Sequence, residues 1–102
     1  MAFNHSLSKE EIINVLKNLK PILYENFGIE EIALFGSFSR EEASSDSDID
    51  ILVIKMKEKN GLILAKAKRF LSDYFGREVD IGLYDSLRPY IKHKILKDLI
   101  NV

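Results

Sequence analysis

The sequence predicts an α+β fold in which a small mixed β-sheet packs against α-helices. Apolar residues recur at helical spacing in three separate segments of the chain. Short runs rich in Ile, Leu and Val lie between these segments, and glycine or polar residues bound each run, as is typical of strands. The length of 102 residues fits a single domain, residues 1–102, that can bury a core of its own.

The first helix is expected from Ser8 to about Phe27. Ser8 is followed three residues later by Glu11, which is the pattern of a capping box at a helix N-terminus. Gly28 is expected to end the helix, and Pro21 is expected to kink it. The apolar residues with helical spacing are Ile12, Leu16, Leu19, Leu23 and Phe27.

Three strands are expected after this helix, at residues 31–35, 48–54 and 78–84. The lysine-rich segment 55–61 is interpreted as a loop. A second amphipathic helix is expected from Leu62 to Phe75, because its apolar residues again follow helical spacing and Gly76 provides a stop signal.

A last helix is expected near the end of the chain, with Asp85 or Ser86 as its N-cap. Its core face would consist of Ile91, Ile95 and Leu99, which are spaced four residues apart.

Composition excludes several classes of protein. The net charge of −1 argues against general binding to nucleic acid backbones, so no direct nucleic acid binding is expected. No apolar stretch approaches the length of a membrane span, and the N-terminus lacks the basic and apolar blocks of an export signal. With no cysteine available for disulfides, a cytoplasmic location follows by default.

Three aspartates stand in or beside apolar strand segments, where a charged residue needs a reason. Asp48 and Asp50 are two residues apart, so a strand would project both to one side and Ile49 to the other. Asp80 lies between Val79 and Ile81 in another strand. If these strands are neighbours, the three carboxylates converge on one patch. Such oxygen ligands suit Mg²⁺, which relieves their mutual repulsion and shares its coordination with substrate phosphates.

A glycine-serine turn precedes the acidic pair. Gly36 permits close approach of the backbone, and the Ser37 hydroxyl can donate to a phosphate oxygen. Residues 37–43 could form a helical turn whose free N–H groups bind an anion. Each feature alone has a structural alternative: the glycine-serine pair as an ordinary turn, and Asp80 as the partner of a neighbouring Lys or Arg. Together they indicate a site for metal and phosphate.

These motifs closely resemble those of the minimal nucleotidyltransferases, the MNT proteins of the polymerase-β-like nucleotidyltransferase superfamily. The family pattern is Gly-Ser, ten residues, then Asp-x-Asp, and here Gly36-Ser37 is followed by residues 38–47 and then by Asp48-Ile49-Asp50. Arg40 matches the arginine of the family's Gly-Ser-x-x-Arg segment, and Asp80 matches its third acid. Glu41 departs from the pattern, because the family commonly has glycine there.

The resemblance implies a nucleotidyltransferase fold and the transfer of AMP from ATP to a hydroxyl group. Asp48, Asp50 and Asp80 would be the catalytic and metal-binding residues, with two Mg²⁺ ions expected. Gly36, Ser37 and Arg40 would bind the nucleotide, although Arg40 could instead brace the turn.

Proteins of this family are often antitoxins of HEPN/MNT toxin–antitoxin modules, so the resemblance implies a HEPN-domain toxin as partner and its tyrosine as the acceptor. Two alternatives stay open. One is a non-catalytic antitoxin that binds and blocks its toxin. The other is a small-molecule nucleotidyltransferase, which would normally carry a second domain for its substrate.

Overall fold

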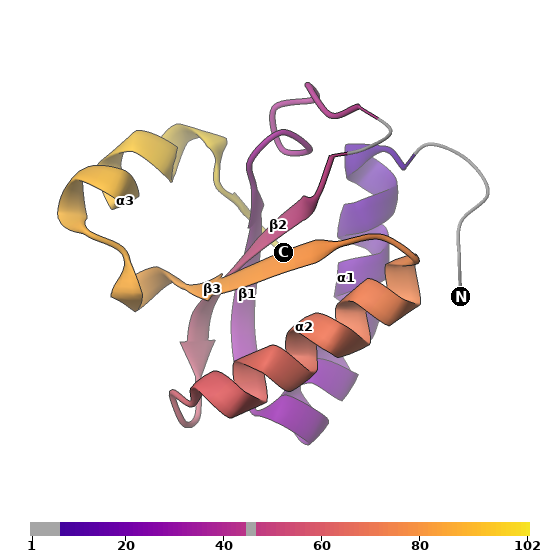
Figure 1. The fold of residues 1–102 in the computed structure, drawn as a ribbon, viewed down its shortest axis with the longest axis vertical. Helices are drawn as coiled ribbons and strands as arrows, with labels where there is room; N and C mark the ends of the chain where they lie inside the picture. The colour runs from indigo at the N-terminus through magenta and orange to yellow at the C-terminus, as the bar shows by residue number, and fades with distance from the viewer. Residues whose placement is uncertain (1–6, 45–46) are drawn as a thin grey trace.

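The computed structural model describes residues 7–44 and 47–102, and its elements form the predicted α+β arrangement (Figure 1). The sheet has four strands in the order β3-β2-β1-β4, with a parallel β2–β3 pair and antiparallel pairs elsewhere, so it is mixed as expected. The elements in chain order are α1 (Lys9–Phe27), β1 (Ile29–Phe35), β2 (Ile49–Met56), α2 (Gly61–Phe75), β3 (Val79–Leu83), η1 (Tyr84–Ser86), α3 (Pro89–Ile95), η2 (Leu96–Asp98) and β4 (Ile100–Asn101).

Helix α1 begins and ends where the sequence signals place it. The backbone N–H of Glu11 donates to Ser8 Oγ at 3.1 Å, and Ser8 N–H donates to Glu11 Oε1 at 3.1 Å, which forms the capping box. Gly28 ends the helix in a left-handed conformation with φ of 66°. Pro21 lies inside the helix without ending it.

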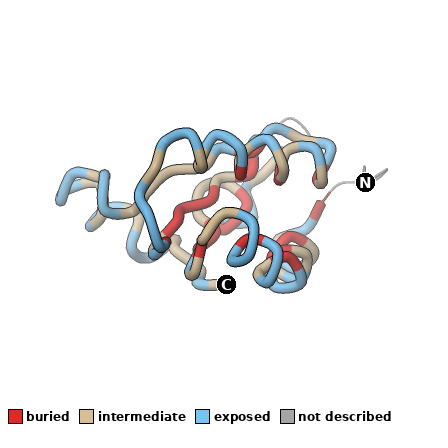
Figure 2. The backbone as a smooth tube through the Cα atoms, turned by 90° about the horizontal axis from the view of Figure 1, so that it is seen from below, coloured by how far each residue is buried: buried red, intermediate tan, exposed pale blue. Residues whose placement is uncertain are grey.

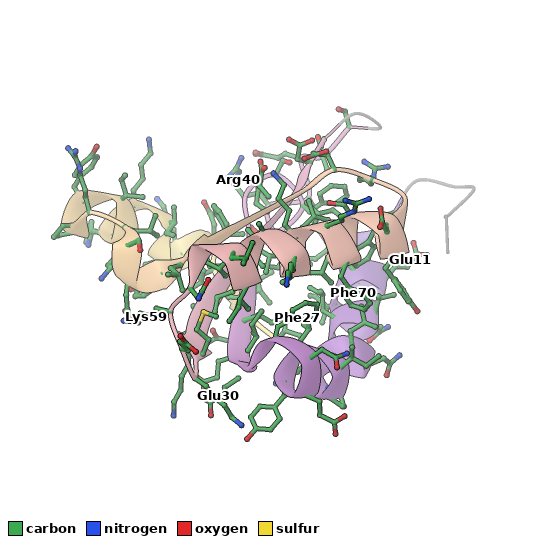
Figure 3. The ribbon with its side chains drawn as sticks, turned by 60° about the horizontal axis from the view of Figure 1, so that its bottom comes forward. Glu11, Phe27, Glu30, Arg40, Lys59 and Phe70 are labelled. Carbon is green, nitrogen blue, oxygen red and sulfur yellow. The ribbon has the colours of Figure 1, made fainter. Side chains whose placement is uncertain are left out.

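Helices α1 and α2 cover one face of the sheet, and the core lies between them and the strands (Figure 2). Ile49, Ile51 and Val53 of β2 are fully buried in this core, so the predicted alternation of the strand is confirmed. The two helices also contact each other through Phe27 and Phe70, whose ring centroids are 5.8 Å apart (Figure 3). The opposite face of the sheet therefore receives the alternate side chains, which include those of the aspartates.

Several predicted boundaries are wrong by one or two residues. Strand β1 begins at Ile29 rather than residue 31, and β2 begins at Ile49, immediately after Asp48. Strand β2 also continues to Met56, into the segment predicted as a loop, because Met56 pairs with Ile29 and is buried. Helix α2 begins at Gly61, and its N-cap is Asn60, whose Oδ1 accepts from Leu62 N–H at 2.8 Å.

The prediction for the C-terminal segment needs more correction. Asp85 and Ser86 belong to the short helix η1 and do not cap α3, which begins at Pro89 and has no side-chain cap. The predicted core face at Ile91, Ile95 and Leu99 is only partly buried, and Leu99 lies beyond both α3 and η2.

The sequence also failed to predict β4, which pairs antiparallel with β1 at the edge of the sheet. Val102 N–H donates to Ile32 O at 3.1 Å, and Lys20 Nζ of α1 donates to Val102 O at 2.9 Å. These bonds fix the end of the chain against the sheet. Within residues 7–44 and 47–102, no helix has the length and apolar character needed to cross a membrane.

Candidate active site

The parallel register of β2 and β3 brings two of the predicted aspartates together. Asp50 and Asp80 are direct partners across this pair, so their side chains project to the same face of the sheet. Asp50 is half-buried, whereas Asp80 is exposed, with 55% of its side chain accessible. Asp48 lies one residue before β2 and is also exposed. The two strands are neighbours, which is the condition on which the carboxylates were expected to converge.

The electrostatics of Asp50 reflect this crowding. Burial raises the pKa of its carboxyl above the ordinary value, and the negative charges of Asp80 and Asp48 raise it further, while Arg40 acts in the opposite direction. A carboxylate in such surroundings favours a proton or a metal cation beside it. The charge and the oxygen chemistry of these residues therefore fit Mg²⁺.

The geometry is more open than that of a complete protein cage for a metal. Among the described residues, no group of three or more His, Cys, Asp or Glu side chains is gathered closely enough to hold an ion. Mg²⁺ is commonly held by one or two carboxylates together with substrate phosphates and water, so the open arrangement suits a metal that arrives with a nucleotide.

The glycine-serine turn lies directly against Asp50. Phe35, the last residue of β1, pairs with Asp50, and Gly36 then turns away from the sheet with φ of 80°. A Cβ atom on Gly36 would overlap Asp50 Oδ2 and lie 3.0 Å from Asp50 Cγ. Glycine is therefore required at this position both for the backbone conformation and for the approach of the carboxylate.

Hydrogen bonds hold the turn in a compact shape. Arg40 N–H donates to Gly36 O at 3.2 Å, and Glu42 N–H donates to Ser37 O at 2.9 Å. The hydroxyl of Ser39, which is largely buried, also donates to Gly36 O at 2.9 Å. The turn therefore contains one helix-like i to i+4 bond, although residues 37–43 do not form a helix.

The amides at the start of this turn are available to a ligand. In the part of the chain that the structure describes, the N–H groups of Ser37, Phe38 and Ser39 donate no hydrogen bond. Consecutive unpaired N–H groups in a tight turn attract anions. Ser37 is only partly buried, and its binding to phosphate stays a prediction. Residues 45 and 46 of the ten-residue spacer lie outside the described residues.

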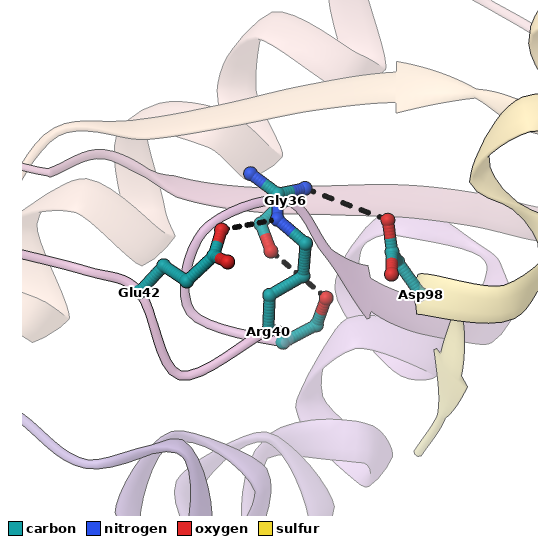
Figure 4. Close-up of polar contacts among 5 residues, drawn as sticks. Gly36, Arg40, Glu42 and Asp98 are labelled. Atoms are coloured by element: carbon teal, nitrogen blue, oxygen red, sulfur yellow. Dashed lines mark hydrogen bonds and ion pairs between the residues drawn. The ribbon is translucent and has the colours of Figure 1, made fainter.

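Arg40 is held by two carboxylates (Figure 4). Its Nε donates to Glu42 Oε1 at 2.8 Å, and its Nη1 lies 3.5 Å from Asp98 Oδ2 of η2. These contacts connect the turn to the C-terminal segment, as expected for a bracing residue. The charge of Arg40 still lowers the pKa of Asp50, so it lies close enough to act on the site electrostatically.

Glu41 has the only positive φ among the non-glycine residues that the structure describes, at 59°. The turn thus keeps a left-handed conformation at the position where the family pattern commonly has glycine. The Glu41 carboxylate lies 3.5 Å from Lys9 Nζ of α1, so this side chain pairs with the first turn of the helix.

Sequence reasoning missed two residues next to the predicted site. Ser39 closes the turn, and its signal was a hydroxyl residue three positions after a glycine, a common side-chain to backbone turn pattern. Lys68 of α2 lies 3.4 Å from Glu78 and 3.6 Å from Asp80 Oδ1. Asp80 therefore has the lysine partner that the structural alternative expected, and it also lies next to Asp50.

Comparison with known proteins places this chain among enzymes. The family model for the nucleotidyltransferase domain matches residues 16–102. A Methanocaldococcus jannaschii protein, MJ1217, is 40% identical over 93 residues, covering 90% of this chain and 95% of its own length. Protein adenylyltransferase MntA of Thermococcus cleftensis is 36% identical over 96 residues, covering 94% of this chain and 97% of its own length.

Solved structures share the fold. A structure described as a minimal nucleotidyltransferase superposes with a TM-score of 0.78 at 28% identity, covering 98% of this chain and 100% of that chain. An MNT antitoxin structure, in complex with tri-AMPylated Shewanella oneidensis HEPN toxin, superposes with a TM-score of 0.58 at 20% identity. The match covers 91% of this chain and 66% of that chain. The matched domain spans the turn and all three aspartates, and this chain belongs to the nucleotidyltransferase domain family.

Proposed function

We propose that this protein transfers AMP from ATP to a tyrosine hydroxyl of a partner HEPN toxin, and that it thereby acts as an antitoxin. The observation that carries the proposal is the pairing of Asp50 with Asp80 across the parallel strands, beside the turn at Gly36. An acidic pair next to unpaired amides is suited to a metal-bound triphosphate.

Each residue of the site has a proposed role. Asp48 and Asp50 would hold Mg²⁺, and two ions are expected from the family pattern. When bound, Mg²⁺ neutralises charge on the phosphates and makes the attacking hydroxyl a better nucleophile. Ser37 and the free turn amides would hold the outer phosphates, while Arg40 braces the turn through Glu42 and Asp98.

The transfer itself is a displacement at phosphorus. The acceptor oxygen forms a bond to the α-phosphorus of ATP, the bond from that phosphorus to the pyrophosphate oxygen breaks, and the hydroxyl proton is released. Asp80, which is exposed beside Asp50, would take this proton or help to hold the metal at the attacking oxygen. Its exposure also leaves room for a protein acceptor.

The known activities in the names of similar proteins support a protein acceptor. The Thermococcus relative is named a protein adenylyltransferase, and 94% of this chain matches almost the whole of it. Other proteins of this fold were solved as a toxin–antitoxin complex with AMP-PNP and as a complex containing an AMPylated HEPN toxin. These associations favour protein adenylylation over modification of a small molecule.

The proposal is tested by label transfer. The protein and a HEPN toxin that co-purifies with it are incubated with Mg²⁺ and ATP labelled at the α-phosphate, beside the variants Asp48→Asn, Asp50→Asn and Asp80→Asn. Asp73→Asn is the matched control, because Asp73 is an exposed aspartate of α2. We expect label on the toxin with wild type and with the control, and none with the site variants.

The same variants separate transfer from simple blocking. If the site variants still neutralise the toxin in cells, the protein acts by binding, and adenylylation is not its antitoxin mechanism. If they bind the toxin but fail to neutralise it, transfer is required. Label on a small molecule instead of the toxin would support the small-molecule alternative. Mass spectrometry of the labelled toxin then identifies the acceptor residue and the number of groups added.

A further inference from the structure

We propose that Arg77 is a positioning residue of this active site, where it fixes the chain that carries Asp48 against the glycine-serine turn. The inference rests on the proposed function and adds a residue to its site. Arg77 lies between α2 and β3, outside the Gly-Ser and Asp-x-Asp motifs.

The first contact of Arg77 is with the segment leading into β2. Its Nη1 donates to the backbone oxygen of Ser47 at 3.0 Å, in a partly buried position. Ser47 immediately precedes Asp48, so this bond fixes the peptide group from which the Asp48 residue extends. Within the described residues, the Asp48 side chain has no hydrogen bond or ion pair of its own. Its position therefore depends on the backbone beside it.

The second contact is with the turn. The guanidinium carbon of Arg77 lies 5.4 Å from the centre of the Phe38 ring, and Phe38 is buried with 3% exposure. Arginine over an aromatic face is a favourable cation–π arrangement. Phe38 stands between Ser37 and Ser39, whose amides are the proposed phosphate ligands. One guanidinium thus touches both segments that form the site.

Hydrogen bonds also hold the backbone around Arg77 in place. Arg77 N–H donates to Ser72 O at 3.3 Å, and the next residue, Glu78, accepts from Ile49 N–H at 3.0 Å. Ser72 Oγ also accepts from Val79 N–H at 3.1 Å. The side chain therefore extends from a frame that is hydrogen-bonded on both sides, so it can hold the Asp48 segment at a defined place.

Arginine is suited to this position because its planar group can donate along its edge and stack on its face at once. Lysine keeps the charge and a donor but lacks the plane. We therefore expect a ranked effect on metal binding. Arg77→Met, which keeps only an apolar stem, should weaken metal binding more than Arg77→Lys. Arg77→Lys should in turn weaken it more than the substitution of a distant arginine.

The test measures metal binding directly. Mn²⁺ replaces Mg²⁺, and its free concentration is followed by electron paramagnetic resonance in the presence of AMP-PNP, against a protein-free sample with the same AMP-PNP that corrects for Mn²⁺ bound by the nucleotide alone. We expect Arg77→Met to weaken Mn²⁺ binding by about 10–100-fold, as is usual when a group that orients a metal ligand is lost. Label transfer at low metal should fall in parallel and recover at high metal. Arg69→Met is the matched control, because Arg69 is an exposed arginine of α2.

Several results would overturn the inference. Wild-type Mn²⁺ affinity in folded Arg77→Met would do so, as would a lower Tm with no change in Mn²⁺ affinity, which is the signature of a purely structural residue. A loss of AMP-PNP affinity with unchanged Mn²⁺ affinity would mean that Arg77 contacts the nucleotide instead. If Arg77→Met does not fold, Arg77→Lys decides, and wild-type Mn²⁺ affinity there refutes the proposal.

Failure of the inference is distinguishable from failure of the proposed function. If wild-type protein neither labels the toxin nor binds Mn²⁺ with AMP-PNP, the proposed function fails, whatever Arg77 does. If wild type labels the toxin and both Arg77 variants match it at limiting metal, the function stands and only the positioning role is lost.

Discussion

Replacement of Gly36 by alanine should separate stability from activity, because the added methyl group meets two different obstacles. The first is the backbone, since φ at Gly36 is 80°. A left-handed conformation costs a residue with a Cβ about 1–2 kcal/mol. The second is the Asp50 carboxylate, which lies within overlap distance of the new Cβ and must move.

Gly28→Ala supplies the matched control for the first obstacle. Gly28 has φ of 66°, and a Cβ there would meet Lys57 Cβ at 3.4 Å, an ordinary contact. Each variant should therefore lose about 1–2 kcal/mol of stability from its backbone conformation, which lowers Tm by about 4–8 °C per kcal/mol in a domain of this size, and Gly36→Ala should lose more because Asp50 must also move. Only Gly36→Ala should displace a carboxylate of the site.

The assay is label transfer to the toxin at a temperature where both variants are folded. A displacement of about 1 Å in a catalytic group can cost about 100-fold in rate, so we expect this loss for Gly36→Ala and nearly wild-type transfer for Gly28→Ala. Wild-type transfer by Gly36→Ala would refute the reasoning, because it would mean that Asp50 works equally well from another position.

Three further predictions concern stability. Burial and the negative charges of Asp80 and Asp48 raise the pKa of Asp50 in the folded protein. The stability that this carboxyl contributes is therefore fully present below the ordinary carboxyl pKa, where it is protonated in both states, and is lost as the pH rises through the raised pKa. Without metal, Asp50→Asn should therefore have a higher Tm than wild type at pH 7, and the difference in Tm should shrink as the pH is lowered. Equal Tm values for the two proteins at pH 7 and at acidic pH would contradict this. Glu41→Gly relieves a left-handed conformation and should stabilise by up to about 1 kcal/mol in urea unfolding, whereas a loss would show that the Lys9 pair matters more. Ser8→Ala removes the cap of α1 and should cost about 1 kcal/mol in the same assay, and no change would contradict the capping role.

The features that sequence predicts well are those with local signals. The capping box of Ser8 and Glu11 and the stop at Gly28 lie within the helix they bound, so α1 was predicted almost to the residue. The direction of the side chains at the start of β2 followed from the pattern Asp48-Ile49-Asp50-Ile51, in which acidic and apolar residues alternate. The motif spacing then pointed to the neighbouring turn, and the structure places Gly36 against Asp50.

The features that sequence misses depend on contacts between distant segments. Strand β4 has two residues and exists because Asn101 and Ile100 pair with β1, far earlier in the chain. Arg77 escaped notice for the same reason, since its partner is a backbone oxygen thirty residues away, which no residue type can signal. The C-terminal helix was misplaced because its apolar residues are only partly buried and its start has no side-chain cap.

The alternation of side chains that indicated the site in β2 also fixes the register of this strand. A slip of one residue in β2 would bring Asp50 into the helix-covered core and move Ile51 and Val53, which are now fully buried there, to the opposite face of the sheet. An Ile or Val that became exposed there would lose about 1.5–3 kcal/mol, and an unpaired buried carboxylate would cost several kcal/mol more, unless it were protonated. Asparagine at position 50 keeps the apolar share of this penalty, so the register should survive the substitution. Because strand β2 should then stay in place, a loss of AMP transfer in Asp50→Asn would result from the missing charge of the carboxylate.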